Sequence, residues 1–261
     1  MKKNLILSMV LSIAFIACAR PSVNVDSLAR TQRVVLDISR YQGEDINFEK
    51  VMRSSVKWVY IKATEGMNID PLFMSNIKKA KSAKMHVGAY CFFSEKSGAR
   101  DQADKFINTV KSAGVDLDLI PMVDVERLLS YSPAQLCDSV KVLLDCLEAE
   151  FKCKPLIYSG ERFFLDNLQD LGKEYPSWIA KYGPNAPDLC GIDYVLWQRS
   201  EDGIVNGINS RVDVSTFNGN HRPRDIKLPS SSQGDDKKDS KSSKKDKKKG
   251  KGDRKQKNAS E

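Results

Sequence analysis

Eight short apolar runs alternate with helical patterns along the chain, and this alternation most restricts the folds open to it. The runs are rich in β-branched and aromatic residues and lie at 33–39, 56–63, 86–93, 119–126, 154–159, 177–182, 194–200 and 211–217. Helical patterns lie between the earlier runs, at about 71–83, 98–112, 133–151 and 160–168. Strands that alternate with helices are typical of largely parallel sheets, so the chain is predicted to have an α/β fold.

The spacing of the runs also predicts how the sheet closes. The pattern at 133–151 has a clear helix start, with Ser132 ahead of Pro133 in the first turn. The connections between the last three runs are too short for full helices. We therefore expect a barrel that is regular in its first half and irregular or antiparallel in its second.

Polar and aromatic side chains gather near the ends of these runs. They are Asp37, Glu65, Tyr90, Phe92, Asp124, Glu126, Tyr158, Tyr182, Trp197, Gln198 and Asp213. Each alone could be a strand end that meets solvent. Because a (β/α) barrel carries its site at the carboxyl ends of its strands, the set together predicts one functional rim.

Asp124 and Glu126 are the acidic pair at the centre of this prediction. Residues i and i+2 of a strand share a face, so their Cα atoms should lie about 6.5–7 Å apart, with Val125 turned into the opposite layer. Two such carboxyls raise each other's pKa, and the more apolar position should hold its proton. Glycosidic cleavage needs one protonated and one ionised carboxyl. The alternative is a strand end whose acids pair with Arg127 or a nearby lysine.

Further residues near the rim suit contact with a sugar. Flat aromatic faces stack on sugar rings, and amide or ammonium groups donate to hydroxyl or N-acetyl oxygens. The candidate substrate-binding residues are Tyr41, Gln42, Lys62, Glu65, Tyr90, Phe92, Tyr158, Tyr182, Trp197 and Gln198. Several other aromatic residues within the runs are expected to be core.

Six ordered blocks carry a resemblance to a known family. They read LDISRYQGEDINFEKV (36–51), VYIKATEG (59–66), GAYCFF (88–93), PMVDVE (121–126), WIAKY (178–182) and LWQRSEDGIVNGINSRVDVSTFNG (196–219). From about Val34 to Gly219 the chain resembles glycoside hydrolase family 25, the Chalaropsis-type lysozymes, which are N-acetylmuramidases of peptidoglycan.

The resemblance implies a fold and an activity. The fold would be a flattened, irregular TIM-like (β/α)5(β)3 barrel. The activity would be hydrolysis of the β-1,4 bond between N-acetylmuramic acid and N-acetylglucosamine, without metal or cofactor, by a protein that we expect to be a monomer. Glu126 would be the general acid, and Asp124 would stay charged to assist the substrate's N-acetyl group or stabilise the intermediate. Asp37 and Asp213 would complete an acidic ring, and both an acetamido-assisted intermediate and an inverting water stay open.

Two positions depart from the family pattern. Position 41 is Tyr where the family often has Trp, and Cys91 stands where a polar rim residue is frequent. Two other functions compete with the muramidase: a hydrolase of another N-acetylated glycan such as chitin, and a non-catalytic cell-wall-binding barrel. The chitinase pattern D-x-x-D-x-D-x-E is absent upstream of Glu126, and the four intact acids argue against the binding barrel.

The first 31 residues predict export. A basic start and an apolar run end at Phe15-Ile16-Ala17-Cys18, so residues 1–18 are predicted to be a signal peptide of a bacterial protein. The sequence around Cys18 resembles a lipoprotein box, which would lipidate this cysteine and anchor the protein in a membrane; plain secretion is the alternative. Residues 19–31 would be a linker to a catalytic barrel at 32–225.

Residues 226–261 are predicted to be a disordered, lysine-rich tail. Residues 230–261 hold 12 Lys or Arg and 6 Asp or Glu with no aromatic residue, whereas residues 1–229 carry a net charge of +2. The lack of interleaved aromatic residues argues against nucleic-acid binding. The tail could meet anionic wall polymers or a membrane surface, or simply aid solubility. None of the six cysteines forms a CxxC pair, so no metal site is expected.

Overall fold

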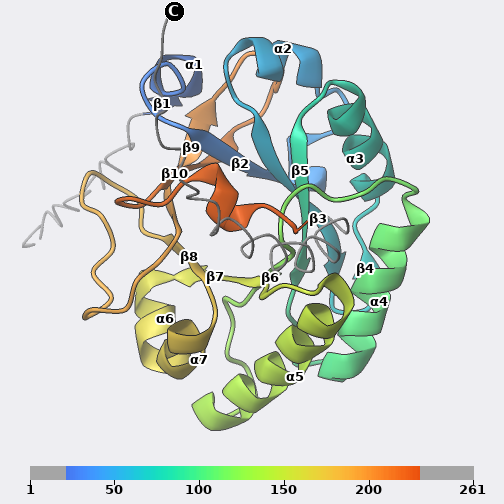
Figure 1. Ribbon diagram of the computed structural model, residues 1–261, viewed down its shortest axis with the longest axis vertical. Helices are drawn as coiled ribbons and strands as arrows, with labels where there is room; N and C mark the ends of the chain where they lie inside the picture. The colour runs from blue at the N-terminus through green and yellow to red at the C-terminus, as the bar shows by residue number, and fades with distance from the viewer. Residues whose placement is uncertain (1–21, 230–261) are drawn as a thin grey trace, which may run out of the picture. The chain divides into compact units, whose positions relative to one another are not determined.

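The computed structural model describes residues 22–229, and they form a closed α/β barrel (Figure 1). The sheet has ten strands, of which β1 (Val23–Asn24) and β4 (Asn68–Ile69) lie outside the ring. The other eight close on themselves in the order β2, β3, β5, β6, β7, β8, β9 and β10. Their bounds are Val34–Ile38, Trp58–Glu65, His86–Phe92, Met122–Asp124, Leu156–Gly160, Ser177–Ala180, Leu196–Ile204 and Val212–Phe217.

The helices confirm the predicted division into five βα units and three bare strands. They lie on the outside of the ring and are α2 (Phe48–Arg53), α3 (Phe73–Ser82), α4 (Ala99–Ser112), α5 (Pro133–Phe151), α6 (Glu161–Asn167) and α7 (Gln169–Glu174) (Figure 1). A helix follows each of β2, β3, β5, β6 and β7, and none lies between β8, β9 and β10. Sequence patterns missed α2 and α7 because six residues are too few to display a helical period.

Helix α5 begins where the sequence predicted. The Ser132 side chain accepts a hydrogen bond from the backbone of Gln135, and the Gln135 side chain accepts one from the backbone of Ser132, with Pro133 in the first turn. The helix ends at Lys152, which takes a left-handed conformation with φ of 57°. The loop before α5 therefore comes directly after the carboxyl end of β6.

Strand β10 is the antiparallel member of the ring. It runs antiparallel to both β2 and β9, whereas the remaining pairs around the ring are parallel. Its amino end therefore lies at the same rim as the carboxyl ends of the other seven strands. Asp213, at the start of β10, consequently stands opposite Asp37, near the end of β2.

Alternating side chains divide the apolar residues into two cores. Those that point into the barrel include Val35, Tyr60, Met122, Leu156, Trp178 and Leu196, with Ile120 and Ile226 closing the end opposite the rim. Those that point outward meet the helices and include Leu36, Ile61, Val123, Ile157, Ile179 and Val214. The Trp178 ring packs edge-on against Tyr60 and Tyr158 and donates from Nε1 to Ser215 Oγ at 2.9 Å, so the barrel has a packed floor.

The folded domain begins before residue 32 and ends after residue 225, the limits predicted for the barrel. The predicted linker, 19–31, contains β1 and helix α1 (Val25–Leu28), and Val25 is fully buried because its apolar side chain packs on the outer core. At the other end Ile226 is fully buried, and Lys227 bridges Leu119. The predicted signal peptide with Cys18 lies outside the described residues, as do residues 230–261 of the predicted tail.

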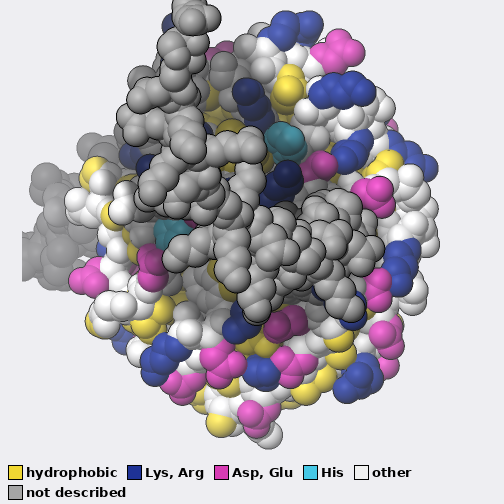
Figure 2. Space-filling view, viewed as in Figure 1, with side chains coloured by type: hydrophobic (Ala, Val, Ile, Leu, Met, Phe, Trp, Pro, Cys, Tyr) yellow, Lys and Arg dark blue, Asp and Glu magenta, His cyan; other side chains and the backbone are white. Residues whose placement is uncertain are grey.

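The described surface mixes charges of both signs. Basic and acidic side chains are interspersed over the coloured part of the face in Figure 2, without a continuous basic stripe there. Within residues 22–229, no helix is long and apolar enough to cross a membrane.

Candidate active site

The four predicted acids lie on neighbouring parts of one rim. Asp37 lies near the carboxyl end of β2, and Asp213 of β10 stands opposite it. Asp124 is the last residue of β6, and Glu126 lies two residues further along the chain. Asp124 is in register with Tyr158 of β7. The register of the strands thus places Asp37 opposite Asp213 and puts the four carboxyls on the same rim, while their roles stay predictions.

Gln198 joins one of these acids to two phenols. Its Nε2 donates to both carboxyl oxygens of Asp37, at 3.1 and 3.3 Å. Its Oε1 accepts hydrogen bonds from the hydroxyls of Tyr158 at 2.8 Å and Tyr182 at 3.0 Å. Gln198 is 1% exposed, so it holds these groups in place from below rather than meeting solvent.

Asp37 and Asp213 behave as one acidic pair. Burial, followed by the charge of Asp213, raises the pKa of Asp37 well above its ordinary value, and the hydrogen bond from Gln198 partly offsets this. Burial also raises the pKa of Asp213, to about 6, although its hydrogen bond with Asp37 works in the opposite direction. Two carboxyls this close cannot both ionise easily, so the pair retains a proton well into the mildly acidic range.

Asp124 and Glu126 form the second pair, and their side chains differ in depth. Val125 is fully buried in the outer core, which confirms that the two acids share the opposite face. Asp124 is 7% exposed, whereas Glu126 reaches solvent at the mouth of the site. Oδ1 of Asp124 is buried and has no hydrogen-bond partner among residues 22–229. The deep acid thus keeps one acceptor available.

Burial dominates the electrostatics of this pair. Burial, followed by the charge of Glu126, raises the pKa of Asp124 well above its ordinary value. Burial also raises the pKa of Glu126, but a hydrogen bond from Tyr158 and the cations Arg127 and Lys62 oppose it. Burial thus disfavours the ionised form of both carboxyls, and the assignment of Glu126 as proton donor and Asp124 as the charged group stays a prediction.

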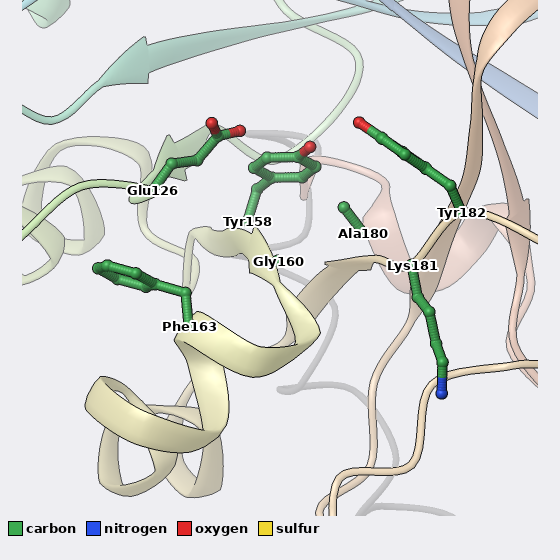
Figure 3. A pocket seen from close by; sticks show the side chains of 7 residues that line it. All are labelled: Glu126, Tyr158, Gly160, Phe163, Ala180, Lys181 and Tyr182. Atoms are coloured by element: carbon green, nitrogen blue, oxygen red, sulfur yellow. The ribbon is translucent and has the colours of Figure 1, made fainter. Parts of the chain in front are cut away.

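A pocket of about 260 Å³ opens beside Glu126. Its lining residues are Glu126, Tyr158, Gly160, Phe163, Ala180, Lys181 and Tyr182. Figure 3 shows the Glu126 carboxyl and the hydroxyls of Tyr158 and Tyr182 turned toward one another, while Lys181 extends away from them. Lys181 donates instead to Glu161 at 2.8 Å. The pocket therefore presents an acid, two phenols and the ring of Phe163.

A second pocket, of about 470 Å³, lies on the other arc of the rim. Its walls include Tyr41, Gln42, Tyr90, Glu201, Arg211 and Asp213. Tyr41 is 71% exposed and Tyr90 is buried beside the acids, which raise its pKa after burial itself. The acid ring thus lies between two hollows, one bounded by β6–β8 and one by β2, β9 and β10 with Tyr90 of β5.

Lys62, Glu65 and Phe92 occupy the arc between β3 and β5. Lys62 Nζ pairs with Glu65 Oε2 at 2.6 Å and lies 4.9 Å from the centre of the Phe92 ring. Its charge also opposes the rise in the pKa of Asp124. Lys62 and Glu65 are therefore engaged with each other, although both lie at the predicted rim.

Three predicted rim positions have other roles in the structure. Gln42 accepts a hydrogen bond from the backbone of Ser39 at 2.8 Å and donates to Arg211 O at 3.1 Å, so both ends of its amide brace the rim. Trp197 packs on the outer core, because neighbouring residues of a strand face opposite sides and Gln198 points inward. Cys91 also faces the outer core and is 2% exposed, so its departure from the family pattern removes no rim contact.

Sequence patterns missed two residues near Glu126. The Glu95 carboxylate accepts hydrogen bonds from the backbone N–H groups of Leu129 at 2.6 Å, Ser130 at 2.5 Å and Tyr131 at 2.9 Å. Arg127, considered only as a possible partner of the acids, stacks over Phe92 with 4.8 Å from its guanidinium carbon to the ring centre. Both contacts join loops that follow different strands, and no local motif marks them.

Comparisons with known proteins agree with this geometry. A sequence model of the family described as Glycosyl hydrolases family 25 matches residues 36–208. The protein YegX of Escherichia coli (strain K12) is 37% identical over 190 residues, which cover 70% of this chain and 69% of that protein. An autolytic lysozyme of Clostridium acetobutylicum is 34% identical over 183 residues, covering 70% of this chain and 55% of that enzyme.

A solved structure extends the similarity to three dimensions. The structure of a family 25 glycosyl hydrolase from Bacillus anthracis superimposes with a TM-score of 0.65 at 27% identity, covering 73% of this chain and 91% of that one. The matched residues run from within β2 to the end of β9 and include three of the four acids, while β10 with Asp213 lies just beyond the match. The chain belongs to glycosyl hydrolases family 25.

Proposed function

We propose that the protein is a lysozyme that hydrolyses the β-1,4 bond between N-acetylmuramic acid and N-acetylglucosamine in peptidoglycan. The observation that carries this proposal is the pair of Asp124 and Glu126, set between two pockets on the rim of a family 25 barrel. A relative that is 34% identical is named an autolytic lysozyme, which supports peptidoglycan as the substrate.

Glu126 is proposed to be the general acid. It is the member of the pair that reaches solvent and lines the pocket, so a glycosidic oxygen can approach it. Burial favours the protonated form of Asp124, and a hydrogen bond links its side chain to that of Glu126. When substrate displaces water, a proton passes from Asp124 to Glu126 along this bond and then to the leaving oxygen.

Asp124 is proposed to act on the N-acetyl group. Once it has given up its proton, its carboxylate stabilises the positive charge that develops as the glycosidic bond breaks. The Asp124 carboxylate can accept the N–H of the acetamido group, which orients the acetamido oxygen toward the anomeric carbon. This arrangement supports the acetamido-assisted route over direct attack by water.

Asp37 and Asp213 are proposed to support the site from the opposite side. Through Gln198, Asp37 fixes the two phenols that form the wall of the pocket beside Glu126. Their shared proton limits the negative charge of the ring, which would otherwise repel the ionised form of Asp124.

Mass spectrometry of products released from purified peptidoglycan tests the proposal. Fragments with muramic acid at the reducing end are the expected result, since the bond on that sugar's anomeric carbon is cleaved. Fragments that end in reducing glucosamine, or release from chitin but not from peptidoglycan, would contradict it. A Glu126→Gln preparation that releases the same fragments at the same rate would contradict the assigned acid.

We also propose that the protein is exported and anchored through a lipid on Cys18, with residues 230–261 attaching it to anionic wall polymers or membrane surfaces. The apolar run that ends at Cys18 and the net charge of +6 in the tail support this. Cys18→Ala should shift the protein from the membrane fraction to the soluble fraction. Removing residues 230–261 should weaken wall binding at low salt without changing cleavage of small fragments, and equal binding would refute the role of the tail.

A further inference from the structure

A cluster of charged side chains lies on the rim beside the acids, between β3, β5 and the loop after β6. It consists of Lys62, Glu65, Phe92 and Arg127, and is called here the cationic arc. Lys62 and Arg127 lie 4.9 and 4.8 Å from the centre of the Phe92 ring. Glu65 pairs with Lys62 at 2.6 Å and lies 4.0 Å from Arg127. Two cations thus share one carboxylate, which leaves a net positive charge.

Arg127 is the accessible cation of the arc. Its side chain is 62% exposed, compared with 11% for Lys62. At 4.0 Å from Glu65 it is beyond hydrogen-bond range, and its guanidinium makes no hydrogen bond to any other residue among 22–229. Stacking on Phe92 nevertheless restrains the guanidinium. The guanidinium group is therefore held in position, and its N–H donors are available to a ligand.

The order of strands places the arc to one side of the cleavage position. One pocket is bounded by β6, β7 and β8, and the other by β2, β9 and β10 together with Tyr90 of β5. Around the ring, β3 and β5 lie between β2 and β6, so the arc stands on the stretch of rim between the two pockets. A chain that crosses the acids from one pocket to the other therefore passes the arc along its flank, where a branch of the chain would project.

The arc also lies close to the acid that we assign as proton donor. Burial raises the pKa of Glu126, and the charges of Arg127 and Lys62 partly offset that rise. Arg127 follows Glu126 directly in the chain. A group bound by Arg127 would therefore belong to a sugar at the cleaved bond and not to a distant part of the polymer.

We infer that the cationic arc binds a carboxylate on the branch of the muramic acid residue, through the guanidinium of Arg127. This inference rests on the proposed function and deepens it. The planar fork of an arginine matches a carboxylate with two parallel hydrogen bonds, and the Phe92 ring supports the apolar part of the branch. The carboxylate is either that of the lactyl group or one on the attached peptide. Glycans without such a branch lack this contact, so the arc favours peptidoglycan over chitin.

The test compares three soluble substrates made from the same glycan strands. The first carries its peptides, so its free carboxylates lie on the peptides and the lactyl carboxyl is tied up in the amide bond to the peptide. The second has lost its peptides to an amidase, which frees the lactyl carboxylate. The third carries its peptides with every carboxylate amidated. Values of kcat/KM are measured for the wild-type protein, Arg127→Gln, Arg127→Lys and the control Arg162→Gln. Arg162 lies on α6 and its side chain is 87% exposed.

The wild-type protein and the control should cleave at least one of the two carboxylate-bearing strands about threefold to tenfold more efficiently than the amidated strands, and Arg127→Gln should bring that ratio close to one. Arg127→Lys should retain part of the ratio, since the charge remains but the planar guanidinium is lost. A high ratio for the peptide-free strands assigns the lactyl carboxylate, and a high ratio for the peptide-bearing strands assigns a peptide carboxylate.

Two results would overturn the inference. One is a wild-type ratio close to one for both carboxylate-bearing strands. The other is an Arg127→Gln protein that loses activity on all three substrates by the same factor, because Arg127 would then act on Glu126 and not on the branch. A wild-type protein that cleaves none of the strands contradicts the proposed function itself, which separates that failure from a failure of this inference.

Discussion

Gln198 donates its amide to both carboxyl oxygens of Asp37, at 3.1 and 3.3 Å, from a position that is 1% exposed. The oxygen of the same amide accepts hydrogen bonds from the hydroxyls of Tyr158 and Tyr182. These contacts fix which end of the amide carries oxygen. They also connect the Asp37–Asp213 pair to the wall of the pocket beside Glu126, so the two acidic pairs share one support.

Replacing Gln198 by leucine should reduce both activity and stability. Asp37 would lose its donor and the two phenols their acceptor, and each unpaired buried group costs about 1–3 kcal/mol. We expect kcat to fall at least tenfold and Tm to fall by several degrees. Gln169→Leu on α7, where the side chain is exposed, is the matched control. If the kcat of Gln198→Leu equals that of the wild-type protein, Gln198 does not support the catalytic site.

Glu126→Gln should abolish turnover while binding persists. Glutamine keeps the shape of the side chain but cannot donate a proton to the leaving oxygen, and general acid catalysis typically contributes about 10²–10⁴-fold. Turbidity clearing of cell walls should fall by about that factor, and cosedimentation with peptidoglycan should be unchanged. Glu49→Gln, on exposed helix α2, should clear walls like the wild type. A similar loss of binding and turnover would indicate a structural role instead.

The dependence of kcat/KM on pH should be bell-shaped. One carboxyl of the Asp124–Glu126 pair must be protonated and the other ionised, and burial raises the pKa of both above ordinary values. The decline on the basic side should therefore begin above the usual carboxyl range. The decline on the acidic side should disappear from the residual activity of Asp124→Asn, because that variant lacks the carboxyl that must ionise. Initial rates on soluble glycan strands between about pH 4 and pH 8 would measure it, and a flat profile would contradict the pair.

Asp213→Asn should stabilise the protein at neutral pH. Burial raises the pKa of Asp213 from 3.8 to about 6, so between these values the folded protein binds more protons than the unfolded chain. The contribution of this group to stability therefore falls as pH rises through that window, and the full cost is present above it. Calorimetry should show a larger rise in Tm for Asp213→Asn at pH 7 than at pH 4. An equal rise at both would contradict the assignment.

Glu95→Ala should loosen the loop that follows Glu126. Partial burial alone would raise the pKa of Glu95, but its hydrogen bonds from the loop lower it to about 2. The stabilisation it provides is therefore complete above its unfolded pKa and lost only as pH falls toward 2. The difference in Tm between wild type and Glu95→Ala should be constant from pH 5 to 8 and shrink in stronger acid, and kcat should fall several-fold.

Glu161→Ala is the comparison for Glu95→Ala, because Glu161 also holds a loop, through the backbone of Asp188 at 2.7 Å, but on the far side of the pocket. Its loss should lower Tm with a smaller change in kcat. If both variants lower kcat equally, the position of Glu95 next to the acid has no special importance.

The strand period carried most of what could be predicted. It placed Asp124 and Glu126 on one face with Val125 in the opposite layer, because that relation depends only on the alternation of side chains. The same alternation places Trp197 on the outer face of the barrel, because its neighbour Gln198 points into the interior. The location of Trp197 on the outer core was therefore available from the sequence, and its aromatic character had favoured the rim instead.

Contacts between loops lay beyond prediction. Glu95 binds the backbone of residues 129–131, and any acid in its loop would look the same in the sequence. The relative acidity of Asp124 and Glu126 was also not available, because it depends on how deep each carboxyl lies. That depth is set by the fold of the whole ring.

The antiparallel β10 has a consequence for when the site is completed during folding. Residues 37 and 213 come together only when this strand inserts between β2 and β9. A growing chain on the ribosome holds Asp37, Asp124 and Glu126 long before it holds Asp213, and pairing across such a long separation forms late. The last strand of the chain therefore closes the ring and completes the Asp37–Asp213 pair in one step.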